Sequence, residues 1–317
     1  MSYGLGHQLY GSLQGHPETQ FISTGLATLI HYFLANYLAR TLDLRMQGIA
    51  IATLVHFAAR LFFSATYCRL NSDLKRGIIP LRHEDSFKEL GYIAKVGWES
   101  FRLKVMGWWA FDVFTQLSAL PPNTDADLAA QTILRNIGLY TYMIPVGLAS
   151  ASNFFTGKYI GANMVEQARK ISTLCMVSAF IWSIGTMLLV GVFQKSIIDF
   201  YTSEKAVQDS IKTAWYVLIM FILCDCMQGV SAGLISGLSL LSKVKNITLI
   251  NYWAIGIPIS IYLMFSLNMG LAGLWYGPTV ACALNFSFYQ YNILKADWQS
   301  LADGIIAKME SQNANLK

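Results

Sequence analysis

Eight apolar segments constrain the fold of this 317-residue chain more than any other feature of its sequence. They cover residues 21–40, 47–68, 91–118, 131–156, 170–193, 212–236, 246–267 and 271–293. An α-helix needs about 20 consecutive, mostly apolar residues to cross the hydrocarbon core of a bilayer, and each segment is close to that length or exceeds it. The sequence therefore predicts an all-α, polytopic membrane helix bundle with about eight transmembrane helices.

The composition supports this class and excludes others. Only 13% of the residues are charged and 54% are hydrophobic, whereas a soluble domain carries about 25% charged residues. This deficit excludes a disordered chain, a coiled coil and a water-soluble enzyme. The net charge of +5 is small and scattered, which argues against a nucleic-acid-binding protein. The five cysteines lie mostly within apolar segments, so we expect reduced packing residues rather than a disulfide framework.

The charges of the loops predict the orientation. Basic residues gather in the loop between the second and third segments and after the fourth and sixth segments. The opposite loops include residues 121–127, which hold no basic residue, and the uncharged turn at 268–270. The positive-inside rule then places both termini in the cytoplasm. In the tail, Trp298, Leu301, Ile305 and Met309 recur at helical spacing, which predicts an amphipathic helix on the inner surface.

Two carboxylates lie where charge is costly. Asp112 is deep in the third segment and Asp225 is in the middle of the sixth. An ionisable group near the bilayer centre costs at least about 2.5–3.5 kcal/mol on insertion scales, so such groups mark ion or substrate pathways. Either carboxyl could hold a proton and release it to a cation. The alternative is a neutral aspartic acid that is hydrogen-bonded to a neighbouring helix.

Small residues and prolines indicate how the helices pack. Gly229, Gly233 and Gly237 form a small-xxx-small stripe that allows another helix to approach closely. Pro145 and Pro258 lie inside apolar segments, where we expect them to kink the helix or break its hydrogen bonding. Motifs of membrane enzymes, such as HExxH, GxGD, GxSxG or a Walker A loop, are missing from the sequence. We therefore expect no enzyme, no cofactor and no metal site.

Several sequence strings in conserved order resemble the multidrug and toxic compound extrusion (MATE) transporters, in particular their eukaryotic branch. The strings are LQGHP at 13–17, WWAFD at 108–112, YMIPVG at 142–147, GKYIGANMVEQAR at 157–169, DCMQGVSAG at 225–233, NYWAIGIP at 251–258 and GLWYG at 273–277. Together they extend over nearly the whole chain.

The resemblance implies two six-helix lobes that face a central cavity and work by alternating access. It also implies residue roles. Asp112 and Asp225 would couple transport to a proton or cation. The substrate would be bound by Trp108, Trp109, Asn136, Tyr142, Gln228 and Tyr252, with cation–π contacts from the tryptophans.

The sequence departs from the family pattern at three points. Gly107 stands where the eukaryotic branch has a glutamate, and Phe155 stands where it has an arginine. The eight segments correspond to family helices five to twelve, so we expect an N-terminally truncated chain. Its parts would be a remnant of the first lobe at 1–70, a cytoplasmic loop at 71–90, the second lobe at 91–295 and a cytoplasmic amphipathic tail at 296–317.

The sequence thus predicts a secondary active transporter that exports small organic cations or xenobiotics in exchange for H⁺ or Na⁺. Its partners would be the organic substrate, the coupling ion and the lipid bilayer of the plasma membrane or a vacuole-like compartment, with no nucleic acid. Two alternatives stay open: a truncated, non-transporting membrane protein or partner subunit, and a flippase for lipid-linked saccharides. The sequence leaves the oligomeric state undetermined.

Overall fold

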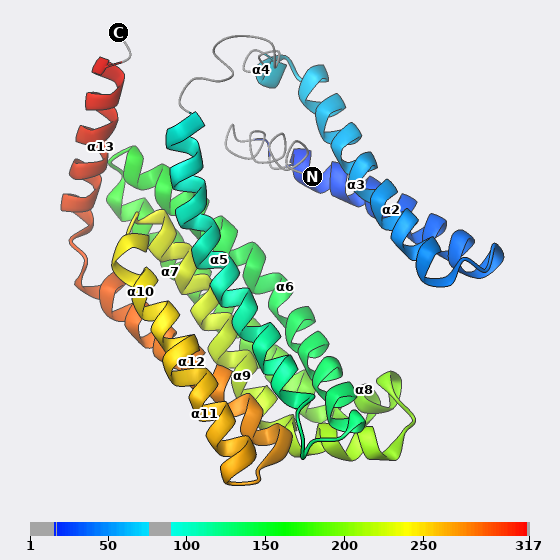
Figure 1. Ribbon diagram of the computed structural model, residues 1–317. Helices are drawn as coiled ribbons and strands as arrows, with labels where there is room; N and C mark the ends of the chain where they lie inside the picture. Colours follow the sequence, from blue (N-terminus) through cyan, green and yellow to red (C-terminus); the bar gives the residue numbers. More distant parts are fainter. Residues whose placement is uncertain (1–15, 17, 76–89, 316–317) are drawn as a thin grey trace. The chain divides into compact units, whose positions relative to one another are not determined.

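The computed structural model describes residues 16, 18–75 and 90–315, without most side chains of 90–106 and those of 245 and 308–315. Within these residues every regular element is a helix, which confirms the all-α class (Figure 1). The chain divides into two compact units, Met1–Tyr92 and Ile93–Lys317.

The first unit is a helical hairpin. Helix α2 (Glu18–Asn36) continues into the π-helix η1 (Tyr37–Thr41), and α3 (Arg45–Leu70) returns along it before the single turn α4 (Ser72–Lys75). The buried residues along the hairpin are small, among them Ser23 and Ala27 of α2 and Gly48 and Ala52 of α3. Small side chains let two helices approach closely, so the hairpin forms without a core of large side chains.

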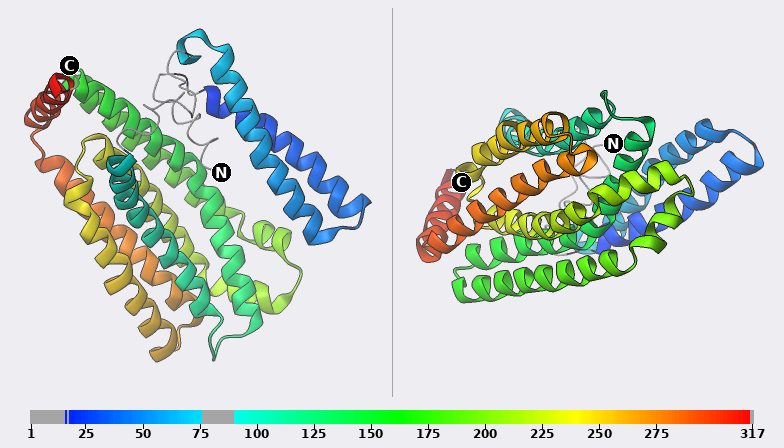
Figure 2. Two further views of the ribbon diagram at one scale, coloured as in Figure 1. Left: turned by 45° about the horizontal axis from the view of Figure 1, so that its top comes forward. Right: turned by 90° about the horizontal axis from the view of Figure 1, so that it is seen from below.

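The second unit is a bundle around α9 (Lys205–Gly237). Its other helices are α5 (Leu90–Ser118), α6 (Asp125–Gly161), α7 (Val165–Val192), α8 (Gln194–Tyr201), α10 (Leu241–Ile250), η3 (Asn251–Gly256), α11 (Ile257–Ile261), η4 (Tyr262–Ser266), α12 (Gly270–Lys295) and α13 (Trp298–Asn315). Helix α9 packs against α6, α7 and α12, between which it runs in Figure 2. The core holds Phe114, Leu134, Trp215 and Leu274, each at most 1% exposed.

Each of the eight predicted segments lies largely or wholly within observed helices. In the described part of the chain, four helical runs are long and apolar enough to cross a membrane: Arg45–Leu70, Val165–Val192, Lys205–Gly237 and Leu241–Ser266. The helices over the other four segments are at least 19 residues long, and the shortest of them, α2, continues into η1. The number of eight transmembrane helices stays a prediction.

The glycine stripe of α9 lies against α6. A Cβ atom on Gly233 would collide with the backbone carbonyl group of Ala149, and one on Gly237 would come within 2.8 Å of the carbonyl oxygen of Asn153. A Cβ on Gly229 would collide with the phenol ring of Tyr142. Gly233 and Gly237 therefore allow backbone contact between α6 and α9, and Gly229 leaves space for the ring of Tyr142.

A hydrogen-bond cluster around Asp127 holds the start of α6. The carboxylate of Asp127 accepts hydrogen bonds from the backbone N–H and hydroxyl of Thr124 at 2.8 and 2.9 Å, and from the Ser210 hydroxyl of α9 at 2.5 Å. Burial raises the pKa of Asp127, but these hydrogen bonds lower it by more, so the pKa lies below its ordinary value.

Pro145 lies inside α6, and the helix continues through it.

The predicted amphipathic tail is helix α13, which packs on the second unit. Trp298 is 6% exposed, and the guanidinium carbon of Arg169 lies 5.4 Å from the centre of its ring. The side-chain amide of Gln299 donates to the side chain of Asn163 at 2.8 Å. The apolar face of α13 therefore covers the turn between α6 and α7. Residues 76–89 of the predicted loop lie outside the described part of the chain, and the domain boundaries stay a prediction.

Candidate substrate cavity

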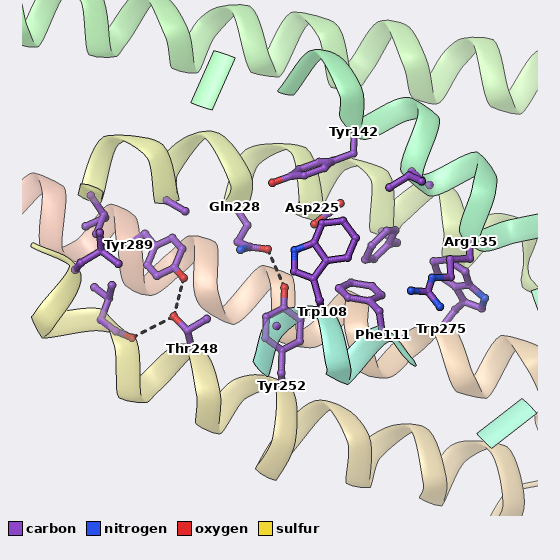
Figure 3. A pocket seen from close by; sticks show the side chains of 18 residues that line it. Trp108, Phe111, Arg135, Tyr142, Asp225, Gln228, Thr248, Tyr252, Trp275 and Tyr289 are labelled. Carbon is purple, nitrogen blue, oxygen red and sulfur yellow. Dashed lines mark hydrogen bonds between the residues drawn. The ribbon is translucent and has the colours of Figure 1, made fainter. Parts of the chain in front are cut away.

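A cavity of about 330 Å³ lies inside the second unit, among α5, α6, α9, α10, η3 and α12 (Figure 3). Aromatic rings supply much of its wall: Trp108, Phe111, Tyr142, Phe221, Tyr252, Trp275 and Tyr289. Among the described side chains that line it, Asp225 and Arg135 are the only ionisable acid or base groups apart from tyrosines. A mostly aromatic cavity with few charged groups suits an organic molecule, which the few polar side chains would hold in one orientation.

Asp225 projects from α9 toward the ring of Tyr142, as Figure 3 shows. One carboxylate oxygen lies 3.8 Å from the thiol of Cys282, which is a weak donor. In the part of the chain that the structure describes, no basic side chain forms an ion pair with Asp225. A half-buried carboxylate without a cation is costly, which makes it a good site for a proton or a ligand cation.

The neighbouring wall carries a short chain of hydrogen bonds. The Tyr252 hydroxyl donates to the side-chain oxygen of Gln228 at 3.0 Å and lies 3.4 Å from the thiol of Cys282. Tyr252 belongs to the π-helix η3, which ends two residues before Pro258. Because proline lacks a backbone N–H, the regular α-helical pattern fails here, and π-turns of this kind often occur at functional sites.

Arg135 of α6 lies at one end of the cavity, near Trp275 and Phe111 (Figure 3). Its Nη2 donates to Asp112 Oδ1 at 2.6 Å, and its Nη1 donates to Thr115 Oγ1 at 3.2 Å. Both acceptors are on α5, one turn apart. The guanidinium group thus bridges α5 and α6 by a charge-assisted pair and a second hydrogen bond. Asp112 itself is not among the residues that line the cavity.

Comparisons with known proteins agree with this architecture. The MatE family model matches residues 113–262. Multidrug and toxin extrusion protein 1 of Danio rerio is 27% identical over 88% of this chain, and the human protein of that name is 24% identical over 93%. The crystal structure of the eukaryotic MATE transporter AtDTX14 superposes on 94% of the chain with a TM-score of 0.87 at 22% identity. The chain is therefore similar in sequence to multidrug and toxin extrusion proteins and has the fold of a MATE transporter.

The match covers only part of the relatives. The chain spans 47% of the Danio rerio protein, 51% of the human protein and 66% of the AtDTX14 chain. An outward-facing multidrug resistance MATE transporter gives the same coverage, 66%, with a TM-score of 0.77 at 18% identity. At these identities the solved structures establish the fold, while the activity of this chain is a separate question.

The cavity brings together most of the residues predicted to bind substrate. Trp108, Tyr142, Gln228 and Tyr252 line it. Trp109 is 53% exposed and Asn136 is also exposed, and neither belongs to the lining. Each of these two follows a lining residue directly in its helix, and successive helical side chains diverge by about 100°. The structure therefore places one member of each adjacent pair in the wall, and the roles themselves stay predictions.

Sequence reasoning missed several residues that line the cavity. Arg135 had a usable signal, because it precedes Tyr142 by seven residues and so lies on the same face of α6, two turns away. Gly138, between them, leaves space for the rings of Phe221 and Trp275. No sequence pattern favoured a place in the cavity over ordinary packing for Phe221, Trp275, Thr248 and Tyr289.

Proposed function

We propose that this chain belongs to a secondary active transporter that exports small organic cations or xenobiotics in exchange for H⁺ or Na⁺ by alternating access. The observation that carries this proposal is a carboxylate, Asp225, that faces an aromatic cavity and has no ion-pair partner in the described residues. Aromatic faces attract cations, most strongly where water is excluded. An organic cation can therefore use both its charge and its apolar surface here.

Competition for Asp225 provides the coupling. A proton and an organic cation each neutralise the same carboxylate, so they cannot both be bound with full affinity. When the proton occupies Asp225, the cation loses its counter-charge and leaves, and the reverse holds on the other side of the membrane. This negative coupling between two ligands is what an exchange mechanism needs.

The other lining residues would position the cation. Trp108, Tyr142 and Tyr252 present rings to the cavity, and Gln228 and Tyr252 are held by their mutual hydrogen bond. The volume of about 330 Å³ is at the low end for small-molecule sites, about 300–1,000 Å³, which favours compact substrates.

We assign the exchange to Asp225 rather than to both aspartates. Asp112 lies outside the cavity lining, and its carboxylate is paired with Arg135. A proton or substrate cation would have to displace a guanidinium group to bind there. The coupling role that the sequence predicts for Asp112 stays a prediction, which the variants described below test separately.

The orientation is also part of the proposal. The basic loops favour a cytoplasmic location for both termini. The membrane would be the plasma membrane or that of a vacuole-like compartment.

Equilibrium binding of a fluorescent organic cation to the detergent-solubilised chain tests the assignment of Asp225. We expect saturable binding that weakens as the pH falls, because protons compete for the carboxylate. Asp225→Asn should weaken binding at least tenfold and remove the pH dependence. Asp209→Asn is the matched control, since it makes the same change at an exposed position on the same helix.

Two results would contradict the proposal. Unchanged binding in Asp225→Asn would show that the carboxylate does not hold the cation. A folded, monodisperse chain with no saturable binding would favour the alternative of a non-transporting membrane protein. Where binding follows the expectation, substrate uptake driven by a pH gradient in proteoliposomes extends the test from binding to exchange.

A further inference from the structure

The Arg135–Asp112 pair sets the charge of the cavity. Among the lining residues that the structure describes, Arg135 is the only basic side chain, and its guanidinium group is 2.6 Å from the carboxylate of Asp112. Its second hydrogen bond, to Thr115, holds it on α5. Since Asp112 cancels the charge of Arg135, these described residues present a single net negative charge, which is that of Asp225.

The two charged places are well separated along the cavity. Arg135 and Tyr142 lie on one face of α6 and are seven residues apart, which corresponds to about 10 Å along the helix axis. Figure 3 shows Asp225 beside Tyr142 in the middle of the cavity and Arg135 toward one end, beyond Phe111. A ligand that extends from Asp225 toward that end meets a free carboxylate and then a neutralised pair.

We propose that Arg135 is a specificity-determining residue that restricts the cavity to organic cations with one positive charge and excludes those with two. The proposal rests on the function proposed above. A monovalent cation finds its counter-charge in Asp225 and its apolar contacts in the rings. The second charge of a divalent cation finds no free counter-charge at the Arg135 end, because Asp112 is already paired with the guanidinium group.

Two probes on one scaffold measure this selectivity directly. Hexyltrimethylammonium carries one quaternary ammonium group, and hexamethonium carries a second one at the other end of the same six-carbon chain. Competition of each probe against a bound fluorescent cation gives a ratio of affinities. We expect the unmodified chain to prefer the monovalent probe by at least tenfold. Equal affinities, or a preference for hexamethonium, would overturn the proposal without the need for any variant.

Arg135→Gln tests the cause. Glutamine keeps hydrogen-bonding capacity toward Asp112 and Thr115 but removes the positive charge, so Asp112 becomes a second free carboxylate. Two unit charges about 10 Å apart in a medium with an effective dielectric constant near 20 interact by an energy that corresponds to roughly tenfold in affinity. The second ammonium group of hexamethonium, which extends toward the Arg135 end, would gain more from the freed Asp112 than the single ammonium group held at Asp225. The preference for the monovalent probe should therefore fall by roughly tenfold, mainly because hexamethonium binds more tightly.

The double variant Asp112→Asn, Arg135→Gln separates this role from a merely structural one. It removes both charges, returns the lining to one net negative charge, and should restore the original preference. Thr115→Val removes the second hydrogen bond of Arg135 without changing any charge, and it should leave the preference unaltered.

Each outcome has a distinct meaning. An unchanged ratio in Arg135→Gln, with binding retained, would show that the ion pair only holds α5 against α6. If neither probe nor the fluorescent cation binds the unmodified chain, the proposed function fails, rather than the role of Arg135 within it. Restored cation binding in the double variant, after a loss in Asp112→Asn alone, would also show that Asp112 acts through Arg135 and not as a coupling site.

Discussion

The hairpin α2–α3 and the bundle around α9 contain similarly apolar helices, but the bundle buries a larger part of its apolar surface. The most apolar windows of α3 and α9 have mean hydropathies of 1.6 and 1.9, yet 17% of the α3 window is buried against 56% of the α9 window. Phe33 and Leu54 of the hairpin are 69% and 70% exposed, whereas Phe114 and Trp215 of the bundle are almost fully buried. Hydropathy thus identifies helices suited to a membrane without telling which of their faces pack.

The two regions also differ in what holds their helices together. The hairpin buries small residues and adds isolated hydrogen bonds between helices, such as Tyr67 to Glu18 at 3.2 Å. The bundle adds a continuous aromatic and aliphatic core, together with glycine positions at which backbones touch. Substitutions of one kind should therefore have unequal effects in the two regions.

The largest difference is expected for the removal of a phenylalanine ring. Phe114→Ala leaves a cavity in the bundle and should destabilise the chain by about 3 kcal/mol. Phe33→Ala removes a ring that is 69% exposed and should change stability little. Thermal unfolding in detergent, followed by the loss of the monodisperse peak, measures both variants. Equal losses would mean that the Phe33 ring is packed in the solubilised protein.

Glycine-to-alanine substitutions should separate the two regions by a smaller amount, and their effects on stability should have opposite signs in the bundle and in the hairpin. Gly233→Ala places a methyl group against the backbone of Ala149, so α6 and α9 must separate, at a cost of about 1–3 kcal/mol. Gly25→Ala in α2 meets no atom within 4 Å, and alanine favours a helix over glycine by up to about 1 kcal/mol. The same melting assay should show a lower unfolding temperature for Gly233→Ala and an equal or higher one for Gly25→Ala.

The smallest difference is expected for two carboxylates near helix starts. The pKa of Asp127 lies below its ordinary value, as does that of Glu18, which is hydrogen-bonded first by His16 and then by its own backbone. A lowered pKa in the folded state means that the stabilisation is complete above the unfolded-state value, about 4, and is lost as the pH falls through the folded-state value.

Asp127→Asn should therefore lower the unfolding temperature at pH 7, with a loss of about 1 kcal/mol from its capping role. Its difference from the unmodified chain should shrink below about pH 4. Glu18→Gln should behave with the same sign and a smaller amplitude, because Glu18 is more exposed. A difference that grows on acidification would contradict the lowered pKa values.

Much of the bundle could be predicted from local patterns. Runs of apolar residues gave the helices, the spacing of Gly229, Gly233 and Gly237 gave a face for close packing, and the period of Trp298 and Leu301 gave the tail helix. These features depend on residues that are near one another in the chain. The π-helices at 251–256 and 262–266 were not predicted, although Pro258 gave a local reason to expect broken α-helical hydrogen bonding nearby. The close contacts of Gly273 and Gly277 of α12 with this part of the chain also could not be read from local patterns.

The candidate site shows the same division more sharply. The sequence by itself determined the helical class and the family resemblance. It also singled out Asp225, whose charge is costly within an apolar helix, whereas Trp108, Tyr142, Gln228 and Tyr252 were chosen because of the resemblance. Only the tertiary structure decided that Arg135 pairs with Asp112, that Asn136 and Trp109 lie outside the cavity lining, and that Asp225 has no ion-pair partner among the described residues. The reason is physical: the net charge that a cavity offers a ligand depends on which side chains of different helices meet, and the rotation of each helix about its axis, set by packing, determines those meetings.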